Sequence, residues 1–481
     1  MQNPQKTALL YKVLRELTLL NAKTGAPIQM QFQLLKEIEE EVTHTLSDLI
    51  RINTTNPPGN ETEAAKYVAE CLGRDGFNCE LYESAPSRGN VVTCLKGTGE
   101  KPSLLLLSHL DVVAANAEEW SVDPFGGIVK DGFVWGRGAL DMKGMAAIEM
   151  MTMKLLKRNN VKLKGNVMLA ATADEEQGGL AGAGYLVHNY PEKVSADYVL
   201  NEGGGLAFPV RGKNVFAVAT AEKGLLWFRV TAKGTPGHGS TPNLADNAIM
   251  RMNKVIEKLG SYRSEVLFVP TVKQYLKALA EEDASLQQPF SRLLANPKLS
   301  DEVLGELAEV AKPLAEEIRP RIRVTITPTM ISGGVKENVI PSECEAVFDC
   351  RILPGQNTAD ALQLIRELLK DVGLDKLALE VIQANEPSES PTETPLYDVI
   401  ADVVRAFEPN CGLAPMLMTG GTDSRFFRRM GSVCYGFQPM RPEAAYDEVV
   451  KRMHGIDERI SVANLVFGAS VLYEVVKKFM S

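Results

Sequence analysis

Residues of the types that bind divalent cations stand at separate points of the chain, each in a polar motif after an apolar run or a glycine-rich turn. They are His109, Asp141, Glu176, Glu202 and His454. Imidazole nitrogens and carboxylate oxygens are ligands that zinc-class ions take from proteins. The set would suit two divalent ions about 3.5 to 4 Å apart, with a bridging carboxylate and an open position on each ion. The chemistry predicted is hydrolysis, with zinc as the first expectation and cobalt or manganese as alternatives.

Two more acidic residues complete this set. Asp111 lies two residues beyond His109 along an extended segment, so its carboxylate shares a face with the imidazole and can accept the second ring N–H. Glu175 precedes Glu176 and is the carboxylate that we do not assign as a metal ligand. We expect Glu175 to be the general base that takes a proton from the attacking water and delivers it to the leaving nitrogen. Asp141 is the expected bridge between the two ions.

Each of these residues also has a purely structural interpretation. Asp141 could cap a helix, Glu175 and Glu176 could be solvated loop charges, Glu202 could belong to a turn, and His454 could be a surface histidine. Their joint occurrence, mostly at the ends of apparent strands, favours the metal site.

The elements that must position these residues alternate between strands and helices. The run "LLLLSHLDVV", residues 104–113, predicts a buried strand that ends near His109. Strand patterns in "NVMLAATAD" and "DYVLNEG" end just before Glu175 and at Glu202. Functional groups gather beyond the carboxyl ends of parallel strands. The alternation predicts an α/β fold, with a three-layer catalytic domain built on a mostly parallel sheet.

The sequence pattern changes near residue 219, where a smaller inserted α+β domain is expected to begin. Its patterns predict two helices on a four-stranded sheet, with a charged helical elaboration at residues 263–320. Apolar positions between residues 7 and 20 recur at helical spacing and predict a helix that packs on the core or binds a partner. The predicted parts are a helical N-terminal extension at 1–40, the catalytic domain at 41–218 and 389–481, and the inserted domain at 219–388.

Composition restricts the partners and the compartment. Among 481 residues, 52 Lys and Arg stand against 61 Asp and Glu, and the net charge of -9 argues against binding of nucleic acid or of an anionic membrane surface. The seven cysteines include no CxxC pair, and an odd number cannot pair fully within one chain, which favours the reducing cytoplasm. We find no signal-peptide pattern and no run of the ~18 to 20 apolar residues that a membrane span needs.

The motifs "SHLDVV", "GRGALDMKG", "TADEEQGG", "NEGGG", "GTPGHGS" and "MHGIDERI" occur in this order between residues 40 and 480. On these motifs the chain resembles the M20 metallopeptidase family, which includes carboxypeptidases, aminoacylases and deacylases. The resemblance implies two metal sites that share Asp141, one with His109 and Glu202 and the other with Glu176 and His454. It also implies a cis peptide bond after Asp141 and an inserted lid domain through which homodimers form.

The same resemblance implies functions for residues of the inserted domain. His238 in "GTPGHGS" would reach a neighbouring subunit's active site and polarise the scissile carbonyl, although a tight turn alone would also explain the motif. Asn338 and Arg351 match positions that bind the carboxylate of the substrate, for which a guanidinium fork is suited.

The segment "MTGGTDSRFF" would add to that substrate site. By resemblance, backbone groups of Gly420, Gly421 and Thr422 would lie beside the substrate. Arg425 is either a second anion contact or a surface arginine.

The motifs "GGTDSRFF", "YGFQPM" and "HGIDERISV" most resemble the branch of carboxypeptidase S and the mammalian N-fatty-acyl-amino-acid hydrolase. This resemblance implies cleavage of the amide bond of N-acyl amino acids, or of short peptides with a free C-terminal carboxylate. Members of that branch are commonly secretory or vacuolar, whereas this sequence shows no signal pattern. The alternatives are a metal-dependent aminopeptidase or dipeptidase, and a catalytically silent metal-binding scaffold. A dinucleotide-binding enzyme is disfavoured, because "GRGALD" and "GLAGAG" fail the GxGxxG spacing.

Overall fold

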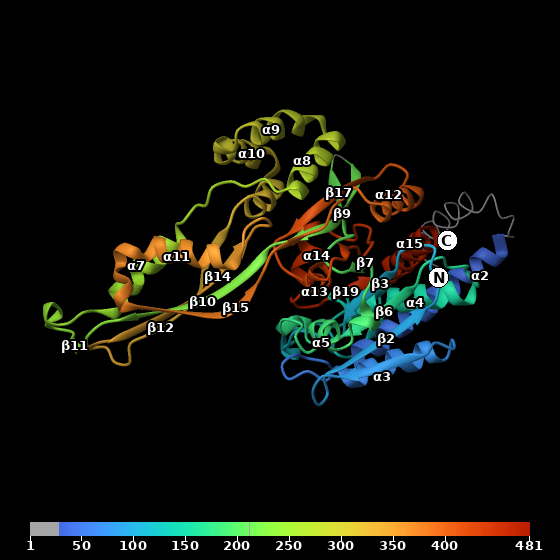
Figure 1. Cartoon of the computed structure of the whole chain (residues 1–481), viewed down its shortest axis with the longest axis horizontal. Coiled ribbons are helices and arrows are strands. Elements are labelled where there is room, and N and C mark those ends of the chain that lie inside the picture. The colour runs from blue at the N-terminus through green and yellow to red at the C-terminus, as the bar shows by residue number, and fades with distance from the viewer. Residues whose placement is uncertain (1–27, 211) are drawn as a thin grey trace. The chain divides into compact units, whose positions relative to one another are not determined.

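The computed structural model describes residues 28–210 and 212–481, so the helix expected between residues 7 and 20 lies outside the described residues. The chain divides into two compact units (Figure 1). Unit 1 comprises residues up to 219, 390–415 and 422–481, and unit 2 comprises 220–389 and 416–421. Among the described residues, no helix combines the length and the apolar character that crossing a membrane requires.

Unit 1 alternates between helices and strands, as its sequence patterns predict. Its helices are α2 (Ile28–Arg51), α3 (Glu61–Gly73), α4 (Lys143–Arg158), α5 (Ala183–Asn189), α6 (Pro191–Val194), α12 (Pro395–Phe407), α13 (Ser424–Arg429), α14 (Tyr446–Arg452) and α15 (Val462–Met480). Its strands are β1 (Cys79–Glu83), β2 (Gly89–Leu95), β3 (Leu104–His109), β4 (Ile128–Lys130), β5 (Phe133–Trp135), β6 (Val167–Thr172), β7 (Tyr198–Asn201), β8 (Ala207–Val210), β18 (Val433–Gly436) and β19 (Arg459–Ser461). Two strands, β9 (Lys213–Glu222) and β17 (Gly412–Met418), include residues of both units.

The central sheet of unit 1 is mainly parallel. Its order is β1-β2-β6-β3-β7-β18-β9, and β3 pairs in parallel with both β6 and β7, as β18 does with β7. The strands β1, β2 and β9 run antiparallel to their neighbours. The parallel strands bring their carboxyl ends to one edge of the sheet. The predicted α/β fold with a mostly parallel sheet is confirmed.

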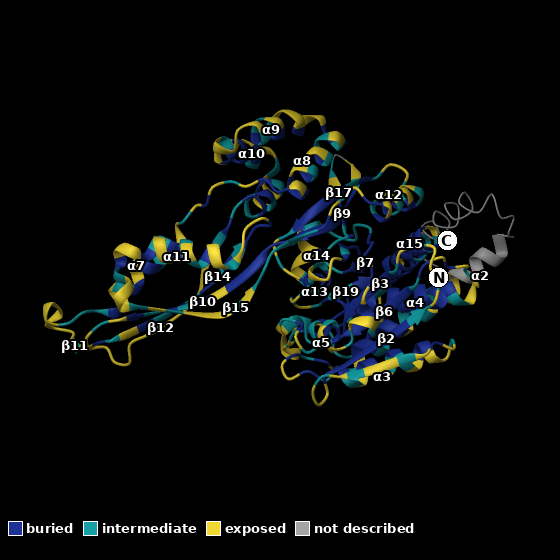
Figure 2. Ribbon diagram, in the orientation of Figure 1, coloured by how far each residue is buried: buried dark blue, intermediate teal, exposed yellow. Residues whose placement is uncertain are grey.

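Both faces of this sheet are buried (Figure 2). On β3, Leu104 and Leu106 join the core formed with α2, α3, α4 and α15, whereas Leu105 and Leu107 join a second cluster that includes Phe427 of α13. Successive side chains of a strand point to opposite faces, so the leucine run of the sequence fills both layers. Each buried leucine stabilises the fold by ~1.5 to 3 kcal/mol. The result is the predicted three-layer arrangement.

Side-chain caps fix where several helices begin. The Thr394 hydroxyl accepts a hydrogen bond from Tyr397 N at the start of α12, and the Ser461 hydroxyl accepts one from Asn464 N at the start of α15. Such caps satisfy backbone N–H groups that have no partner inside the helix. They therefore set the helix boundaries from local sequence.

Unit 2 is built on a four-stranded antiparallel sheet of the order β12-β14-β10-β15. The strands are β10 (Gly224–Lys233), β12 (Thr325–Gly333), β14 (Glu343–Ile352) and β15 (Leu377–Asn385), and the helices α7 (Ala248–Gly260) and α11 (Thr358–Gly373) pack on the sheet. In the core that the sheet forms with these helices, Phe228 and Phe348 stack with ring centroids 5.2 Å apart. Alternate residues of β10 and β14 are buried, which leaves the other face of this sheet more open.

The remaining elements of unit 2 are helical or very short. The helices α8 (Pro270–Glu282), α9 (Ala284–Ala295) and α10 (Ser300–Ile318) form the elaboration that the sequence indicates. The two-residue strands β11 (Gly237–His238) and β13 (Val339–Ile340) pair with each other, and β16 (Ser388–Glu389) pairs with the end of β9.

Candidate metal centre and active site

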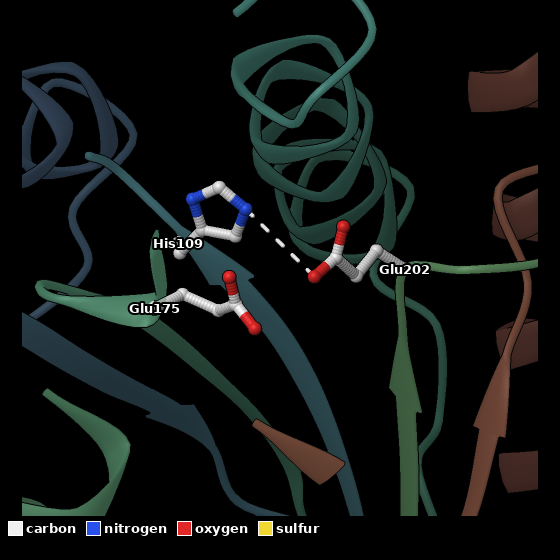
Figure 3. A group of neighbouring side chains, drawn as sticks. All are labelled: His109, Glu175 and Glu202. Atoms are coloured by element: carbon white, nitrogen blue, oxygen red, sulfur yellow. Dashed lines mark ion pairs between the residues drawn. The ribbon is translucent and has the colours of Figure 1, made fainter. Parts of the chain in front are cut away.

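Three consecutive parallel strands end in residues of the predicted site. Strand β3 ends at His109, β6 leads into the short 3₁₀ helix Glu175–Gln177, and β7 is followed directly by Glu202. Because these strands share one sheet edge, their last side chains meet, and ligand atoms of His109, Glu175 and Glu202 lie within 4.8 Å of one another. Figure 3 shows the three side chains turned toward a common space.

Asp141 lies between the two histidines. Its Oδ1 is 3.1 Å from His109 Nε2, and its Oδ2 is 3.0 Å from His454 Nε2. Glu202 Oε1 lies 3.8 Å from the His109 nitrogen, and Glu176 Oε2 lies 3.2 Å from the His454 nitrogen. The structure thus brings the five predicted ligands together as two groups that share the Asp141 carboxylate.

This donor set fits divalent cations. Ligand atoms that share one tetrahedral zinc ion lie about 3.3 to 3.6 Å apart, since each bond is about 2.0 to 2.2 Å long. The distances from the two histidine nitrogens to the carboxylate oxygens, 3.0 to 3.8 Å, bracket this range. Nitrogen and carboxylate oxygen donors also match the preferences of zinc and its first-row neighbours.

The loop that carries Asp141 is held from the carboxyl-terminal part of the chain. The buried Glu458 carboxylate accepts hydrogen bonds from the backbone N–H groups of Leu140 and Asp141, at 2.7 and 3.0 Å, and from Arg137 Nη1 at 2.6 Å. The peptide bond after Asp141 is cis, as the family resemblance implies. Glu458 follows His454 by four residues, so one loop both supplies a histidine and fixes the bridging carboxylate.

Asp111 is fully buried and contacts both the predicted metal ligand His109 and the backbone of the predicted base Glu175. Its backbone carbonyl accepts a hydrogen bond from His109 Nδ1 at 2.9 Å, which leaves Nε2 as the lone-pair nitrogen on the side of Asp141. Its carboxylate accepts from the backbone N–H groups of Glu175 and Glu176, each at 3.1 Å. The sequence predicts the carboxylate as the partner of the imidazole, whereas in the structure Asp111 Oδ1 lies further from Nδ1, at 3.4 Å.

The close packing of acidic groups shifts their protonation. Withdrawal from water raises the pKa of Glu175, and the neighbouring Glu202 carboxylate raises it further. Burial, followed by the charge of Asp141, raises the pKa of Glu202. Hydrogen bonds to Asp141 and Glu176 raise the pKa of His454 to about 10. Such a crowded set of carboxylates is one whose repulsion bound cations would offset.

Within unit 2, His238 and Asn338 are neighbours. Strand β11 ends at His238 and pairs with β13, and the Asn338 carbonyl accepts a hydrogen bond from Gly239 N at 2.8 Å. His238 Nδ1 lies 2.8 Å from Ser240 Oγ and accepts from Ser240 N at 3.2 Å. The side chain of His238 is therefore held by its own turn.

Arg351 lies on β14 and is already paired. Its Nε and Nη2 donate to the two oxygens of Asp349 at 2.8 and 3.1 Å. The fork leaves Nη1 as the guanidinium nitrogen for a further anion. Strand β14, which carries Arg351, pairs with β10 and β12, whereas β11, which carries His238, pairs with β13. Among the described strands of unit 2, no pairing therefore joins Arg351 to His238 or to the neighbouring Asn338.

The segment after β17 is divided between the units: Gly420 and Gly421 belong to unit 2, and Thr422 to unit 1. Thr422 is buried, and its hydroxyl accepts hydrogen bonds from Asn201 Nδ2 and Ser424 N. Arg425 is also buried and donates to the carbonyls of Thr422 and Gly178, each at 2.7 Å. The interpretation of Arg425 as a surface arginine is therefore wrong, because its guanidinium ties two loops together inside unit 1.

Several residues with evident influence on the site were not found from the sequence. They are Asn56, Arg88, Asp174 and Glu458. Glu458 lies inside the quoted motif "MHGIDERI", and Asn56 lies in "NTTNPPGNE", which predicts only a loop. A polar residue in a loop carries no periodicity, so its pattern gives no sign of the side chain that it will meet.

A sequence model of peptidase family M20/M25/M40 matches residues 105–478. The human protein N-fatty-acyl-amino acid synthase/hydrolase PM20D1 is 29% identical over 390 residues, which are 79% of this chain and 75% of that protein. Human Aminoacylase-1 is 28% identical over 443 residues, which are 90% of this chain and 94% of that protein.

Solved structures of the same fold are similar over nearly the whole chain. The M20 family metallo-carboxypeptidase Sso-CP2 from Sulfolobus solfataricus has a TM-score of 0.70 at 19% identity, covering 91% of this chain and 99% of that one. Human carnosine dipeptidase 1 has a TM-score of 0.67 at 17% identity, covering 98% of each chain. At these identities the similarity supports the fold.

Proposed function

Because the chain belongs to peptidase family M20/M25/M40, and is therefore a metal-dependent amidohydrolase, we propose that it cleaves N-acyl amino acids or short peptides with a free C-terminal carboxylate. The observation that carries the proposal is the Asp141 carboxylate, whose two oxygens face His109 and His454. A carboxylate in this position can be shared by two cations, with Glu202 on one side and Glu176 on the other. Bound divalent cations would lower the pKa of a water molecule and polarise the scissile carbonyl.

Glu175 is the proposed general base. Its backbone is fixed by Asp111, and its carboxylate faces the same space as His109 and Glu202 (Figure 3). A carboxylate in this place can take a proton from water and then deliver it to the leaving nitrogen. Asp111 orients the imidazole of His109 through the hydrogen bond at Nδ1.

The proposed substrate follows the names of the relatives. Aminoacylase-1 and the N-fatty-acyl-amino acid synthase/hydrolase are both named for amides between an acyl group and an amino acid. We propose that Asn338, Arg351 and backbone groups of Gly420, Gly421 and Thr422 bind the substrate's carboxylate, and that His238 polarises the carbonyl. Arg351 would donate hydrogen bonds to the substrate's carboxylate from the side of the guanidinium that does not contact Asp349.

We further propose that the protein forms homodimers through unit 2. Strand β12 is an edge of the four-stranded sheet, and Met330 and Ile331 on it are 67% and 62% exposed. The loop that follows it exposes Val335. An edge strand offers unpaired backbone groups to a second copy, and exposed apolar side chains add area to bury. The seven free cysteines support a reducing compartment, for which we propose the cytoplasm.

The first test is hydrolysis of N-acyl amino acids and of their carboxyl-amidated counterparts by protein loaded with zinc or cobalt, beside a chelator-treated sample. Cleavage that chelation abolishes and that requires the free carboxylate is the expected result. Cleavage only of peptides with a free amine would replace the proposal with a metal-dependent aminopeptidase. Absence of any cleavage by protein shown to hold two metal ions would leave a silent scaffold.

A further inference from the structure

A buried polar network of unit 1 leads from the loop before α3 to the backbone of the proposed general base. Its members are Asn56, Glu61, Arg88, Asp111 and Asp174. Asn56, Arg88 and Asp111 are 4%, 9% and 0% exposed. Burying so many polar groups costs free energy unless each has a well-placed partner, so such a network is expected to have specific geometry.

Asn56 is the centre of the network. Its Nδ2 donates to Asp111 Oδ2 at 2.8 Å and to Asp174 Oδ1 at 3.3 Å, and its Oδ1 accepts from Arg88 Nη1 at 3.0 Å. A neutral amide supplies here both the donor and the acceptor that its neighbours require. No other side chain of this size offers a donor pair to two carboxylates and an acceptor to a guanidinium.

The backbone places Asn56 beside Asp111. Residue Thr55 forms a parallel bridge with Val112, and Asn56 N donates to the Val112 carbonyl at 2.9 Å. The segment before α3 therefore runs alongside the chain that leaves β3. This register leaves the amide of Asn56 within reach of the Asp111 carboxylate.

Arg88 closes the network from the other side. Its guanidinium pairs with Asp174 and lies 3.3 Å from Glu61, and Nη1 also donates to the Pro58 carbonyl at 2.9 Å. Gly59 is required for this approach: its φ is +86°, and a Cβ there would lie 1.8 Å from Arg88 Nη1. The loop "NPPGNE" thus accommodates the arginine.

Of the two carboxylates that Asn56 and Arg88 contact, Asp111 holds the backbone of the base, and Asp174 holds the turn that follows it. Asp111 accepts hydrogen bonds from the N–H groups of Glu175 and Glu176, and Asp174 Oδ2 accepts from Ala181 N at 2.9 Å. Asp174 itself has a φ of +74°, a left-handed conformation that a non-glycine residue adopts at a cost and that its surroundings must maintain. The segment that carries the base is therefore strained and held by the network.

We propose that Asn56 and Arg88 are positioning residues, which orient Asp111 and Asp174 so that the backbone of residues 174–176 aims the Glu175 carboxylate at the reacting water. The proposal rests on the proposed function for its effect on turnover. Its structural half, the control of the 174–176 backbone, stands independently of any substrate. We expect neither residue to contact the substrate, so binding of the substrate should change little.

The first experiment measures amide hydrogen exchange in the metal-free full-length protein, in peptides that cover residues 174–177. In Asn56→Asp and Arg88→Met, we expect exchange of the Glu175 and Glu176 amides to be at least about 10-fold faster, because their acceptor loses its orientation. Arg158→Met is the matched control. Arg158 also bridges two carboxylates of unit 1, Glu41 and Asp75, but it does not belong to the buried network. Unchanged exchange in both network variants would overturn the proposal, whether or not the enzyme cleaves N-acyl amino acids.

The second experiment separates positioning from general loss of stability. In metal-loaded protein, both network variants should lower kcat by about 10- to 100-fold while KM changes by less than about twofold. Arg158→Met should lower the free energy of unfolding but leave kcat unchanged. An equal loss of kcat in Arg158→Met at equal stability would contradict the proposal. If Asn56→Asp does not fold, Asn56→Ala, which removes the amide without adding a charge, takes its place.

A double variant tests whether the two residues act in series. If Arg88 acts by orienting Asn56, the variant Asn56→Ala/Arg88→Met should lose no more kcat than the single variant with the larger loss, so the two effects should not multiply. Multiplying losses would show independent contributions and overturn the series arrangement.

Discussion

The two units use their sheets in opposite ways. The parallel sheet of unit 1 is buried on both faces, and its polar chemistry lies at the strand ends, where His109, Glu175 and Glu202 meet. The antiparallel sheet of unit 2 buries one face against α7 and α11 and exposes apolar residues on its edge strand β12. A sheet that is covered on both faces presents functional groups at the ends of its strands. A sheet that is covered on one face can offer a partner its open face and its edge strand.

The sharpest test of the strand-end site is Glu175→Gln. The variant should still bind metal, because the ligands are unchanged, but turnover should fall by about 10²- to 10⁴-fold since the amide cannot accept the proton. Metal content and kcat measured on the same samples check this. Turnover close to that of the wild type would remove Glu175 from the role of base.

The difference in burial predicts a large difference in stability between two similar truncations. Leu106→Ala in β3 should lower the free energy of unfolding by about 2 to 5 kcal/mol, because it leaves a cavity in the core. Ile331→Ala on the exposed part of β12 should change it by less than about 0.5 kcal/mol. Urea unfolding of both variants at low protein concentration, which would dissociate the proposed dimer, measures the two effects. Similar losses would mean that β12 is covered within the monomer.

Unit 1 also buries acidic groups, and the burial of Glu61 should make the free energy of unfolding depend on pH. Burial, followed by the charge of Asp111, raises the pKa of Glu61 from 4.5 to about 7. A raised carboxyl pKa contributes stability below about pH 4.5, and this contribution is lost as the pH rises through about 7. Glu61→Gln should therefore gain about 2 kcal/mol relative to the wild type between pH 5 and pH 8.

The control for this prediction is Glu63→Gln on the same helix, α3, whose side chain is exposed. Its free energy of unfolding should follow that of the wild type at both pH values. A Glu61→Gln difference that is constant with pH would show that the pKa of Glu61 is the same in the folded and the unfolded protein.

The smallest expected effect concerns the proposed dimer surface of unit 2. Ile331→Glu places a charge on edge strand β12 and should weaken dimerisation by at least about 10-fold, which is about 1.4 kcal/mol, without unfolding the monomer. Val310→Glu on α10 is the matched control, because Val310 is an apolar residue of unit 2 that is 85% exposed. Sedimentation of the wild type and both variants gives the dissociation constants. Equal weakening by both substitutions would place the interface elsewhere.

Much of the fold could be predicted because its signals are local. The leucine run of β3, the spacing of α4 and α15, and the caps of α12 and α15 depend on neighbours in the sequence. Local patterns locate the ends of elements less accurately: α5 begins only at Ala183, because Gly178, Gly179 and Gly182 occupy the preceding turn. The family predicted from the ordered motifs is confirmed by the match over residues 105–478.

The sequence by itself determined the residue types of the site and the strands that carry them, because ligand chemistry and the periodicity of a buried strand are both written in local order. Only the tertiary structure decided that Asp141 lies between His109 and His454, and that Asn56 and Arg88 hold the residues behind the base. These contacts join residues about 30 to 310 positions apart, so they depend on how strands and loops pack. Hydrogen bonds in such contacts need distances and directions that no spacing in the sequence records.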